Sequence, residues 1–401
     1  YSDTLRLTLA EAETRFLTEN LDLLIAKTDI DISKAYVLQS KLYSNPEINL
    51  NRQLYNFNSK KFLENGSQAQ FEVQATQLIS TAGKYFKEIQ LSKQKVKLSE
   101  YEFYNTLRSL KFDLRQNYFE LAQAQQKRIV LSTGMEELNK LIDEVKIQVA
   151  KGNVAQKELV RLQSLLVEFS ANEAELQIQI ISNVAALKQL LNYSGNEFIV
   201  ANSESVDWLP QRISALTFDS IQTTAFANRY DMQASTLMVD ISKNQVQLER
   251  MRGVPDLELG VDYDRLGNSV QNYLGLTVNV PLPLWNHNEG SIKAAKANFS
   301  QAQLQLKNNE LIVRNDLQEA YYQLLIKSNL YNTANKHYSK SSDDLYNNIY
   351  DSYKARTIGL IEFLEYFESY RDTKFRLIDI ATDLQIQTQQ LNFETGKDVI
   401  N

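Results

Sequence analysis

The sequence predicts a mostly α-helical protein with a small β part, built as two copies of a strand hairpin joined to a long helical hairpin. Three observations predict this fold class. Only 12 Gly and 5 Pro occur in 401 residues, so residues that interrupt helices are rare. Short segments recur in one order in the two halves of the chain. Apolar residues recur every three or four positions over most of the chain, and every second position in four short segments.

An internal duplication organises the chain. The matched segments are Asp31–Lys34 with Asp240–Lys243, Pro46–Leu50 with Pro255–Leu259, and Asp113-Leu114 with Asp316-Leu317. The first two pairs are 209 residues apart and the third is 203 apart, so the second copy lacks six residues between these points. We therefore expect a first structural repeat over residues 1–195, a linking segment over 196–211 and a second repeat over 212–401.

Each repeat begins with a helix that leads into two strands. Residues 8–44 have helical character with a break near Asn20. Pro46 then ends the helix, because the residue before a proline avoids helical geometry. Beyond it, apolar and polar residues alternate, which predicts strands. The expected strands cover about 46–57, 69–80, 255–264 and 271–283.

The strands are each about ten residues long, which suits two different environments. They fit a tilted strand that crosses a membrane, and equally a soluble antiparallel sheet with one wet face. No window of roughly 18 consecutive apolar residues predicts a transmembrane helix, but membrane proteins built from strands have no such window. A four-stranded sheet has edges that lipid does not tolerate, so a membrane location requires closure by oligomerisation.

Two long helices follow the strands in each repeat. We expect them at about 84–150 and 155–192, and again at about 289–353 and 358–395. The first turn reads Lys151-Gly152-Asn153, with glycine where helices commonly end. A helix of about 65 residues is about 100 Å long, which is deeper than a globular core. Two such hairpins per chain predict a rod or a tube.

Composition and motifs give no sign of catalysis. The net charge is −6 and no long basic block occurs, which argues against a nucleic-acid partner. Cysteine is absent, which excludes disulfides and thiol chemistry. The two histidines, His287 and His337, form no paired metal motif, and no phosphate-binding loop or nucleophile motif is present. We expect no enzyme activity, no catalytic residue, no metal and no cofactor.

Three stretches carry a resemblance to a known family. Pro281–Gly290 reads PLPLWNHNEG and is similar to the strand-to-helix junction of the TolC family of outer-membrane factors, in particular its CzcC and CusC cation-efflux group. Arg356–Glu365 resembles the family's helical tip, with Arg356 replacing the usual glycine or that glycine displaced to Gly359. Lys151–Val154 matches the other tip better. The resemblance covers nearly the whole chain.

The resemblance implies a passive outer-membrane exit channel of a tripartite efflux system. Three protomers would supply twelve strands that close one β-barrel in outer-membrane lipid, and their long helices would form a periplasmic α-helical barrel. A periplasmic adaptor, or membrane fusion protein, would connect the channel to an inner-membrane transporter. The implied location is the outer membrane of a Gram-negative-type bacterium, extending into the periplasm. Metal cations or small toxic compounds are the expected substrates, with drug efflux and type I protein secretion as alternatives within the family.

The resemblance also assigns site residues. Glu362 and Glu365 share a helix face and match positions where relatives carry acidic rings at the narrow periplasmic entrance. Such a ring favours cations, although a solvated helix face is the ordinary role of a Glu pair. Tyr353 is placed near the same closure, where packing is the ordinary role. The tip residues expected to dock the adaptor are Lys151, Gly152, Asn153, Val154, Arg356, Thr357 and Ile358.

Two other classes of protein stay open on the residues alone. A periplasmic adaptor or soluble coiled-coil scaffold also uses long helical hairpins, although an adaptor usually combines one hairpin with several β domains. An enzyme is not forbidden by composition, but no chemistry is arranged. Exposure of the strand residues Leu257, Leu276 and Val278 to lipid separates a channel from a soluble sheet. The sequence does not give the transported substrate, lipidation of the N-terminus or the resting state.

Overall fold

The computed structural model describes residues 4–65, 69–202, 206–266, 270–337, 341–355 and 357–400, and only the backbone of residues 337 and 341–347. The chain divides into two compact units. Unit 1 comprises residues 1–25, 104–230 and 311–401, and unit 2 comprises residues 26–103 and 231–310. Each unit takes segments from both halves of the sequence, so neither half forms a compact unit by itself.

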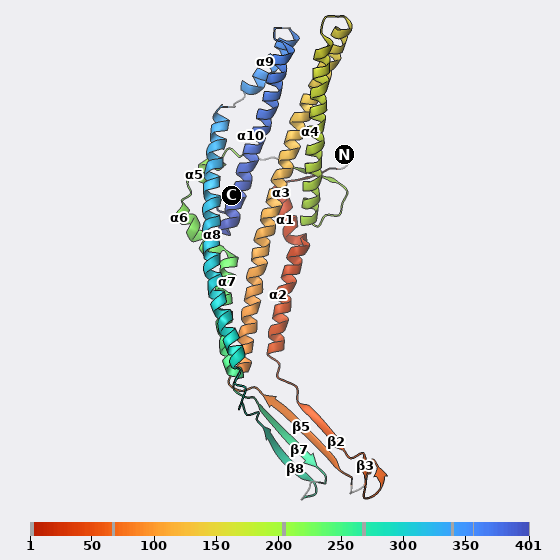
Figure 1. Cartoon of the computed structure of the whole chain (residues 1–401), viewed down its shortest axis with the longest axis vertical. Helices are drawn as coiled ribbons and strands as arrows, with labels where there is room; N and C mark the ends of the chain where they lie inside the picture. The colour runs from red at the N-terminus through yellow and green to blue at the C-terminus, as the bar shows by residue number, and fades with distance from the viewer. Residues whose placement is uncertain are drawn as a thin grey trace. The chain divides into compact units, whose positions relative to one another are not determined.

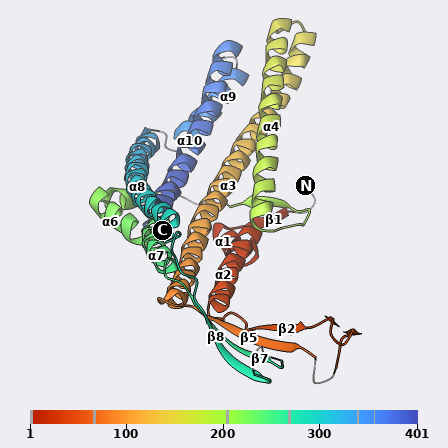
Figure 2. The same cartoon turned by 60° about the horizontal axis from the view of Figure 1, so that its bottom comes forward.

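Unit 2 contains a four-stranded antiparallel sheet in the order β2-β5-β7-β8 (Figure 2). Its strands are β2 (Glu47–Arg52), β5 (Phe71–Ile79), β7 (Leu257–Asp264) and β8 (Tyr273–Asn279). The central pair, β5 with β7, joins the first half of the sequence to the second. The polar loop between β2 and β5 holds a further small hairpin of β3 (Tyr55–Asn56) and β4 (Lys61–Phe62).

The helices of unit 2 are long and belong to both halves of the sequence. They are α2 (Leu21–Ser40), the first part of α3 (Lys84–Ala150), α7 (Tyr230–Arg252) and the first part of α8 (Glu289–His337). In this unit, Leu91 of α3 packs with Ile241 and Leu248 of α7. These apolar residues recur at helical spacing, so burying them fixes one face of each helix.

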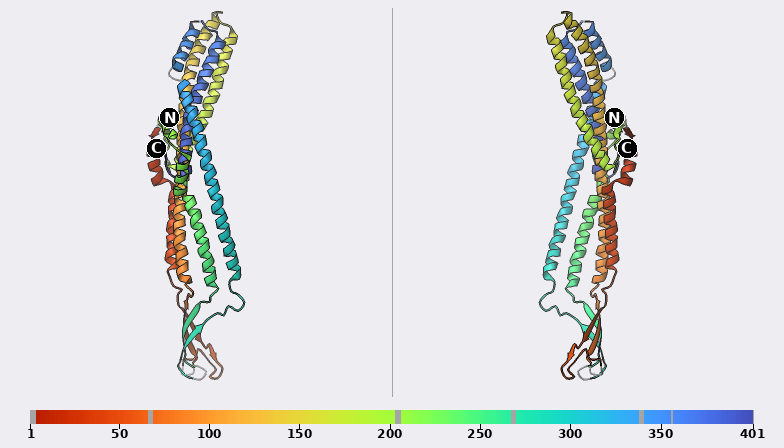
Figure 3. Two further views of the ribbon diagram at one scale, coloured as in Figure 1. Left: turned by 90° about the vertical axis from the view of Figure 1, so that its left-hand side faces the viewer. Right: turned by 90° about the vertical axis from the view of Figure 1, so that its right-hand side faces the viewer.

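Unit 1 contains two helical hairpins. The remainder of α3 lies beside α4 (Gln156–Leu190), where Arg128 forms an ion pair with Glu173, and α9 (Ser341–Lys354) packs against α10 (Leu360–Thr395). The turns of both hairpins lie at the same end of the unit (Figures 1 and 3). α8 and α9 replace the single helix expected over 289–353, and residues 338–340 between them lie outside the described residues.

Short elements complete unit 1. They are β1 (Thr4–Leu7), α1 (Leu9–Glu19), β6 (Phe198–Ala201), α5 (Leu209–Ser214) and α6 (Phe218–Asn228). β1 pairs in parallel with β6, and α5 and α6 bury Ile213, Ile221 and Ala225 against Leu317 of α8 and Leu384 of α10. The expected linker over 196–211 therefore contains a strand and the start of a helix.

The first helical stretch is interrupted at Asn20 and ends at Ser40, earlier than residue 44. The side chain of Asn20 accepts a hydrogen bond from the backbone N–H of Leu23 at 2.9 Å and donates to the carbonyl of Leu190 at 2.8 Å. A buried asparagine that satisfies backbone groups in this way separates α1 from α2.

Among the residues that the structure describes, every helix is too short or too polar to cross a membrane.

Candidate functional site

One face of the sheet in unit 2 is polar and acidic. Antiparallel pairing places opposed side chains on one face. The carboxylates on this face are Glu47, Glu72, Glu258, Asp262 and Asp264, and among the described residues of the four strands no Lys or Arg shares it. Hydrogen bonds cross the strands on this face, with Thr277 donating to Asp262 at 2.8 Å and Asn279 donating to Glu258 at 3.1 Å. The charged side chains that the structure describes on this face are therefore all negative.

The opposite face of the sheet is mostly apolar and exposed, and its polar members are Arg52 and Gln77. In one register row, Ile48, Ala75, Val261 and Leu276 lie side by side across all four strands. Leu276 is 75% exposed, and Ile48, Val261 and Val278 are also exposed. A soluble sheet would bury this face against another layer. An exposed apolar face on a sheet with a wet opposite face is the pattern of strands that contact lipid.

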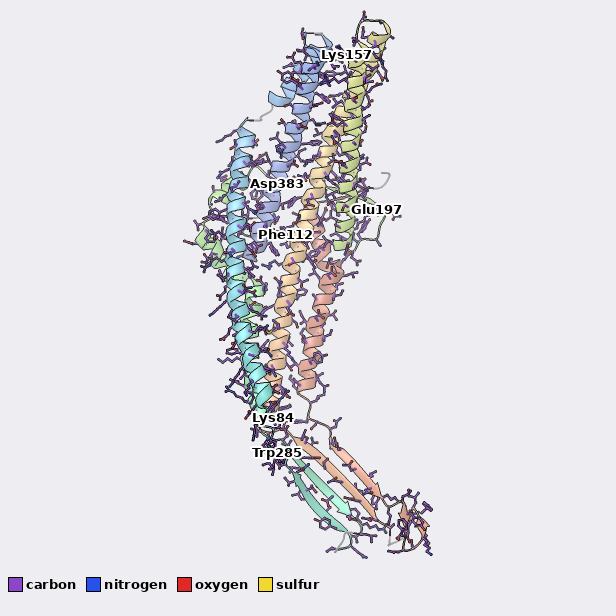
Figure 4. The ribbon with its side chains drawn as sticks, viewed as in Figure 1. Lys84, Phe112, Lys157, Glu197, Trp285 and Asp383 are labelled. Atoms are coloured by element: carbon purple, nitrogen blue, oxygen red, sulfur yellow. The ribbon has the colours of Figure 1, made fainter. Side chains whose placement is uncertain are left out.

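The junction between strands and helices in unit 2 is fixed by charged groups, and Figure 4 shows Lys84 there. The buried Lys84 ammonium donates to the Asp256 carboxylate at 2.7 Å and to the carbonyl of Val254 at 2.6 Å. Thr81 donates its backbone N–H to the same carboxylate at 2.8 Å. The end of β5 and the start of β7 are thereby tied together.

A second contact fixes the segment between β8 and α8. Asn288, at φ 62°, donates its side-chain amide to the carbonyl and the carboxylate of Glu249, both at 2.8 Å. Burial raises the pKa of Glu249, but the hydrogen bond from Asn288 and the charge of Arg252 outweigh it and hold this pKa below its usual value. His287 is exposed, and its carbonyl would meet a Cβ on Gly253 at 2.9 Å. His287 therefore contacts Gly253 through its backbone, and the missing Cβ of Gly253 permits this close approach.

The two helical tips of unit 1 use the same backbone hydrogen bond. Gly152 has φ 76°, and Asn153 donates its N–H to the carbonyl of Gln148 at 2.9 Å, which is the closing bond of a Schellman motif. Thr357 donates to the carbonyl of Ser352 at 2.9 Å, also five residues back. Thr357 thus corresponds to Asn153.

This correspondence sets the register of the second tip. The N-caps of the following helices, Ala155 and Gly359, each lie two residues after the matched donor. Gly359 is therefore a helix N-cap, in the place that Ala155 has at the first tip. Arg356 itself lies outside the described residues.

A groove of about 470 Å³ lies between the two tips. Its walls include Asn153 and Val154 from one tip and Ile358 from the other, with Tyr353 and Lys354 from the end of α9. Val154 and Ile358 are half-buried, whereas Lys151, Gly152 and Thr357 are exposed. The structure thus brings Asn153, Val154 and Ile358 together in the lining of the groove, whereas Lys151, Gly152 and Thr357 are not among its lining residues.

Glu362 and Glu365 are both exposed on the first turns of α10. The opposite side of the helix is buried through Phe363 and Phe367. Tyr353 stacks on Phe363 with ring centroids 4.8 Å apart and planes at 24°. Tyr353 is therefore a packing residue within its own chain, while the two carboxylates point away from that packed face.

Only some of the charged residues of the candidate site can be identified from the sequence. The sequence alone does not identify the strand carboxylates as one group, because their common face exists only once four strands are in register. The signal that the sequence does contain is the alternation of Asp262 and Asp264 with Val261 and Tyr263. Among the described residues, no group of three or more His, Asp or Glu side chains is arranged to hold a metal ion. The side chain of His337 lies outside that set.

Long helical hairpins together with strands that have one acidic and one lipid-compatible face are the features of an outer-membrane channel protein. The family model described as outer membrane efflux protein matches residues 14–193 and 222–397. The chain therefore belongs to the outer membrane efflux protein family. It is an exit duct of a tripartite efflux system, located in the outer membrane and extending into the periplasm.

Individual relatives agree with this family. The chain is 21% identical over 384 residues to the cobalt-zinc-cadmium resistance protein CzcC of Cupriavidus metallidurans, covering 93% of this chain and 86% of that protein. The crystal structure of the CmeC outer membrane channel of Campylobacter jejuni has a TM-score of 0.78 at 18% identity, covering 97% of this chain and 86% of CmeC.

Two further solved structures share the fold. CusC has a TM-score of 0.77 at 15% identity, with 97% of this chain and 92% of CusC covered. The open state of the MtrE outer membrane channel of Neisseria gonorrhoeae has a TM-score of 0.77 at 14% identity, with 98% of this chain and 89% of MtrE covered.

Proposed function

We propose that three copies of this chain assemble into one channel, with twelve strands closing a β-barrel in outer-membrane lipid and the long helices forming a periplasmic α-helical barrel. The observation that carries this proposal is the sheet of unit 2, whose strands β2 and β8 are its two edges and whose apolar face is exposed. Lipid does not tolerate unpaired strand edges, and pairing β8 of one copy with β2 of the next removes both edges.

We infer that the cargo is cationic: metal cations first, with cationic toxic compounds as the alternative. The acidic face of the sheet would line the barrel, since the apolar face takes the lipid side. Rings of carboxylates in a pore raise the local concentration of cations and repel anions. The relative CzcC is named for resistance to cobalt, zinc and cadmium, which agrees with this charge.

We also propose that Glu362 and Glu365 surround the periplasmic entrance and that the groove between the tips docks a periplasmic adaptor, which links the duct to an inner-membrane transporter. The two carboxylates are exposed at the start of α10, and threefold symmetry would place six around one opening. Asn153, Val154 and Ile358 line the groove. Lys151, Gly152, Arg356 and Thr357 are included because they neighbour these residues in the sequence.

Ion selectivity of the purified channel tests the assigned charges. In a planar bilayer under a KCl gradient, the reversal potential should show a preference for K⁺. A carboxylate about 8 Å from a permeating ion contributes about 0.5 kcal/mol even in water, so Glu362→Gln combined with Glu365→Gln should lower the K⁺/Cl⁻ permeability ratio roughly twofold or more. Glu72→Gln combined with Asp262→Asn should act in the same direction.

The matched control is Asp219→Asn, which neutralises an exposed carboxylate on the short helix α6, outside the long hairpins. It should leave the reversal potential unchanged. A preference for anions in the unmodified channel would contradict the inference that the cargo is cationic. If Glu362→Gln combined with Glu365→Gln gives the same reversal potential as the control, the proposal that these two residues surround the entrance is wrong.

A further inference from the structure

Exposed aromatic side chains lie at both ends of the sheet in unit 2, and aliphatic side chains lie between them. At the end where strands meet helices they are Tyr43, Phe86 and Trp285, and at the hairpin end they are Phe57 and Phe62. On the apolar face between them stand Leu50, Val73, Val261 and Leu276. Strands that cross a membrane have this pattern, with an aromatic girdle at each interface.

The apolar stripe of β8 continues past the last paired residue of the strand. Leu274, Leu276 and Val278 alternate along the apolar face, and Val280, Leu282 and Leu284 keep the same alternation beyond Asn279. Leu282 is 71% exposed, and Trp285, which follows, is 92% exposed. Figure 4 shows Trp285 close to the place where the strands meet the helices. An apolar segment so exposed to water lacks a partner of matching chemistry.

The backbone of this segment also suits the border of a bilayer. An unpaired backbone N–H is costly in hydrocarbon. Pro281 and Pro283 have no N–H to satisfy, and Leu284 donates its N–H to the carbonyl of Leu282 at 2.9 Å. The Asn288 to Glu249 hydrogen bonds fix the end of the segment to α7.

The length of the strands matches the distance between two interfaces. β5 has nine residues. At about 3.3 Å per residue and a tilt of about 40°, nine residues span about 23 Å along the membrane normal, close to the ~25 Å apolar band of membrane barrels. The residues that flank the strands on the helix side therefore fall at one edge of the band.

We propose that the segment Val280–Trp285 is a membrane-interface anchor, with Trp285 in the headgroup region of the phospholipid leaflet that faces the periplasm. Tyr43 and Phe86 belong to the same girdle. The inference rests on the proposed placement of the sheet in lipid. It adds the level at which the bilayer ends and the residues that hold the protein there. Indole favours this position, because its ring is apolar and its N–H reaches hydrated groups.

Fluorescence of the full chain in vesicles tests the anchor, since the sequence holds only two tryptophans, Trp208 and Trp285. Trp208→Phe leaves Trp285 as the only reporter. In vesicles of phosphatidylethanolamine and phosphatidylglycerol, lipid brominated near the headgroup should quench most of its emission, and lipid brominated near the methyl end should quench less. Trp285→Phe is the matched control, because Trp208 lies in unit 1 and should not be quenched.

Flotation of the same samples separates this inference from the proposed function. A chain that does not float with the vesicles contradicts the placement of the sheet in lipid. A chain that floats while Trp285 is unquenched overturns the anchor alone, and so does stronger quenching by the deeper bromine. Quenching of Trp285 chiefly by the shallow bromine, with Trp208 unaffected, is the expected result.

Discussion

At the scale of single residues, one arginine holds the chain ends of unit 1 together. Arg115 of α3 donates to Glu13 of α1 at 2.5 Å and to Asp398 at 2.9 Å, and Lys111 donates to Asp398 at 2.8 Å. Burial raises the pKa of Asp398, but the hydrogen bonds from Arg115 and Lys111 outweigh it and hold this pKa below its ordinary value of 3.8. The sequence could not predict this contact, because Arg115 and Asp398 are 283 residues apart.

The lowered pKa of Asp398 predicts a pH-dependent stability. Because the folded pKa lies below the unfolded one, ionised Asp398 stabilises the fold above about pH 4, and this contribution is lost as pH falls through the folded pKa. Asp398→Asn should cost about 1–2 kcal/mol at neutral pH and progressively less in acid. Thermal unfolding of both proteins between neutral and acid pH measures it. An equal deficit at every pH would contradict the ionic role of Asp398.

At the scale of elements, the ends of the long helices could be predicted where glycine residues mark them. α3 begins at Lys84 after Gly83 and ends at Ala150 before Gly152, both glycines having positive φ. β1 and β6 could not be predicted, because each has four residues and its partner lies far away in the chain. The division into repeats over residues 1–195 and 212–401 stays a prediction. It is supported by one strand pair from each half, β2 with β5 and β7 with β8, and by one helical hairpin from each half.

The packing of α9 against α10 gives a prediction that separates the structural residue Phe363 from Glu362, the neighbouring residue that we propose for the entrance. Phe363 is almost fully buried and contacts Tyr353 and Phe367. Phe363→Ala should destabilise this hairpin by about 3–5 kcal/mol, whereas Glu362→Ala, exposed next to it, should cost no more than about 1 kcal/mol. Limited proteolysis around residues 354–360 reports the loosening. Equal cleavage of the two variants would show that the aromatic stack does not hold the tip.

At the scale of the whole molecule, the proposed closure by three copies rests on two strand edges that one chain does not pair. The order β2-β5-β7-β8 leaves β2 and β8 apart within a chain. The alternating directions of the four strands make β8 antiparallel to the β2 of a neighbouring copy, so three copies can close without a parallel pair. The sequence predicted four strands and the need for closure. It could not reveal the acidic face as a unit, because that face depends on the register between distant strands.

Disulfide crosslinking between the edge strands tests trimer closure most directly, since the natural sequence has no cysteine. Ile48→Cys or Leu50→Cys on β2, combined with Leu274→Cys or Leu276→Cys on β8, covers neighbouring registers, with each single variant as control. Oxidation in outer membranes should give covalent dimers and trimers for at least one pair and, for single variants, no species beyond a dimer. Ile48→Cys with Ala75→Cys, which are paired within one chain, should stay monomeric. Trimers from an edge pair would establish the closed duct, and only monomers from every edge pair would contradict it.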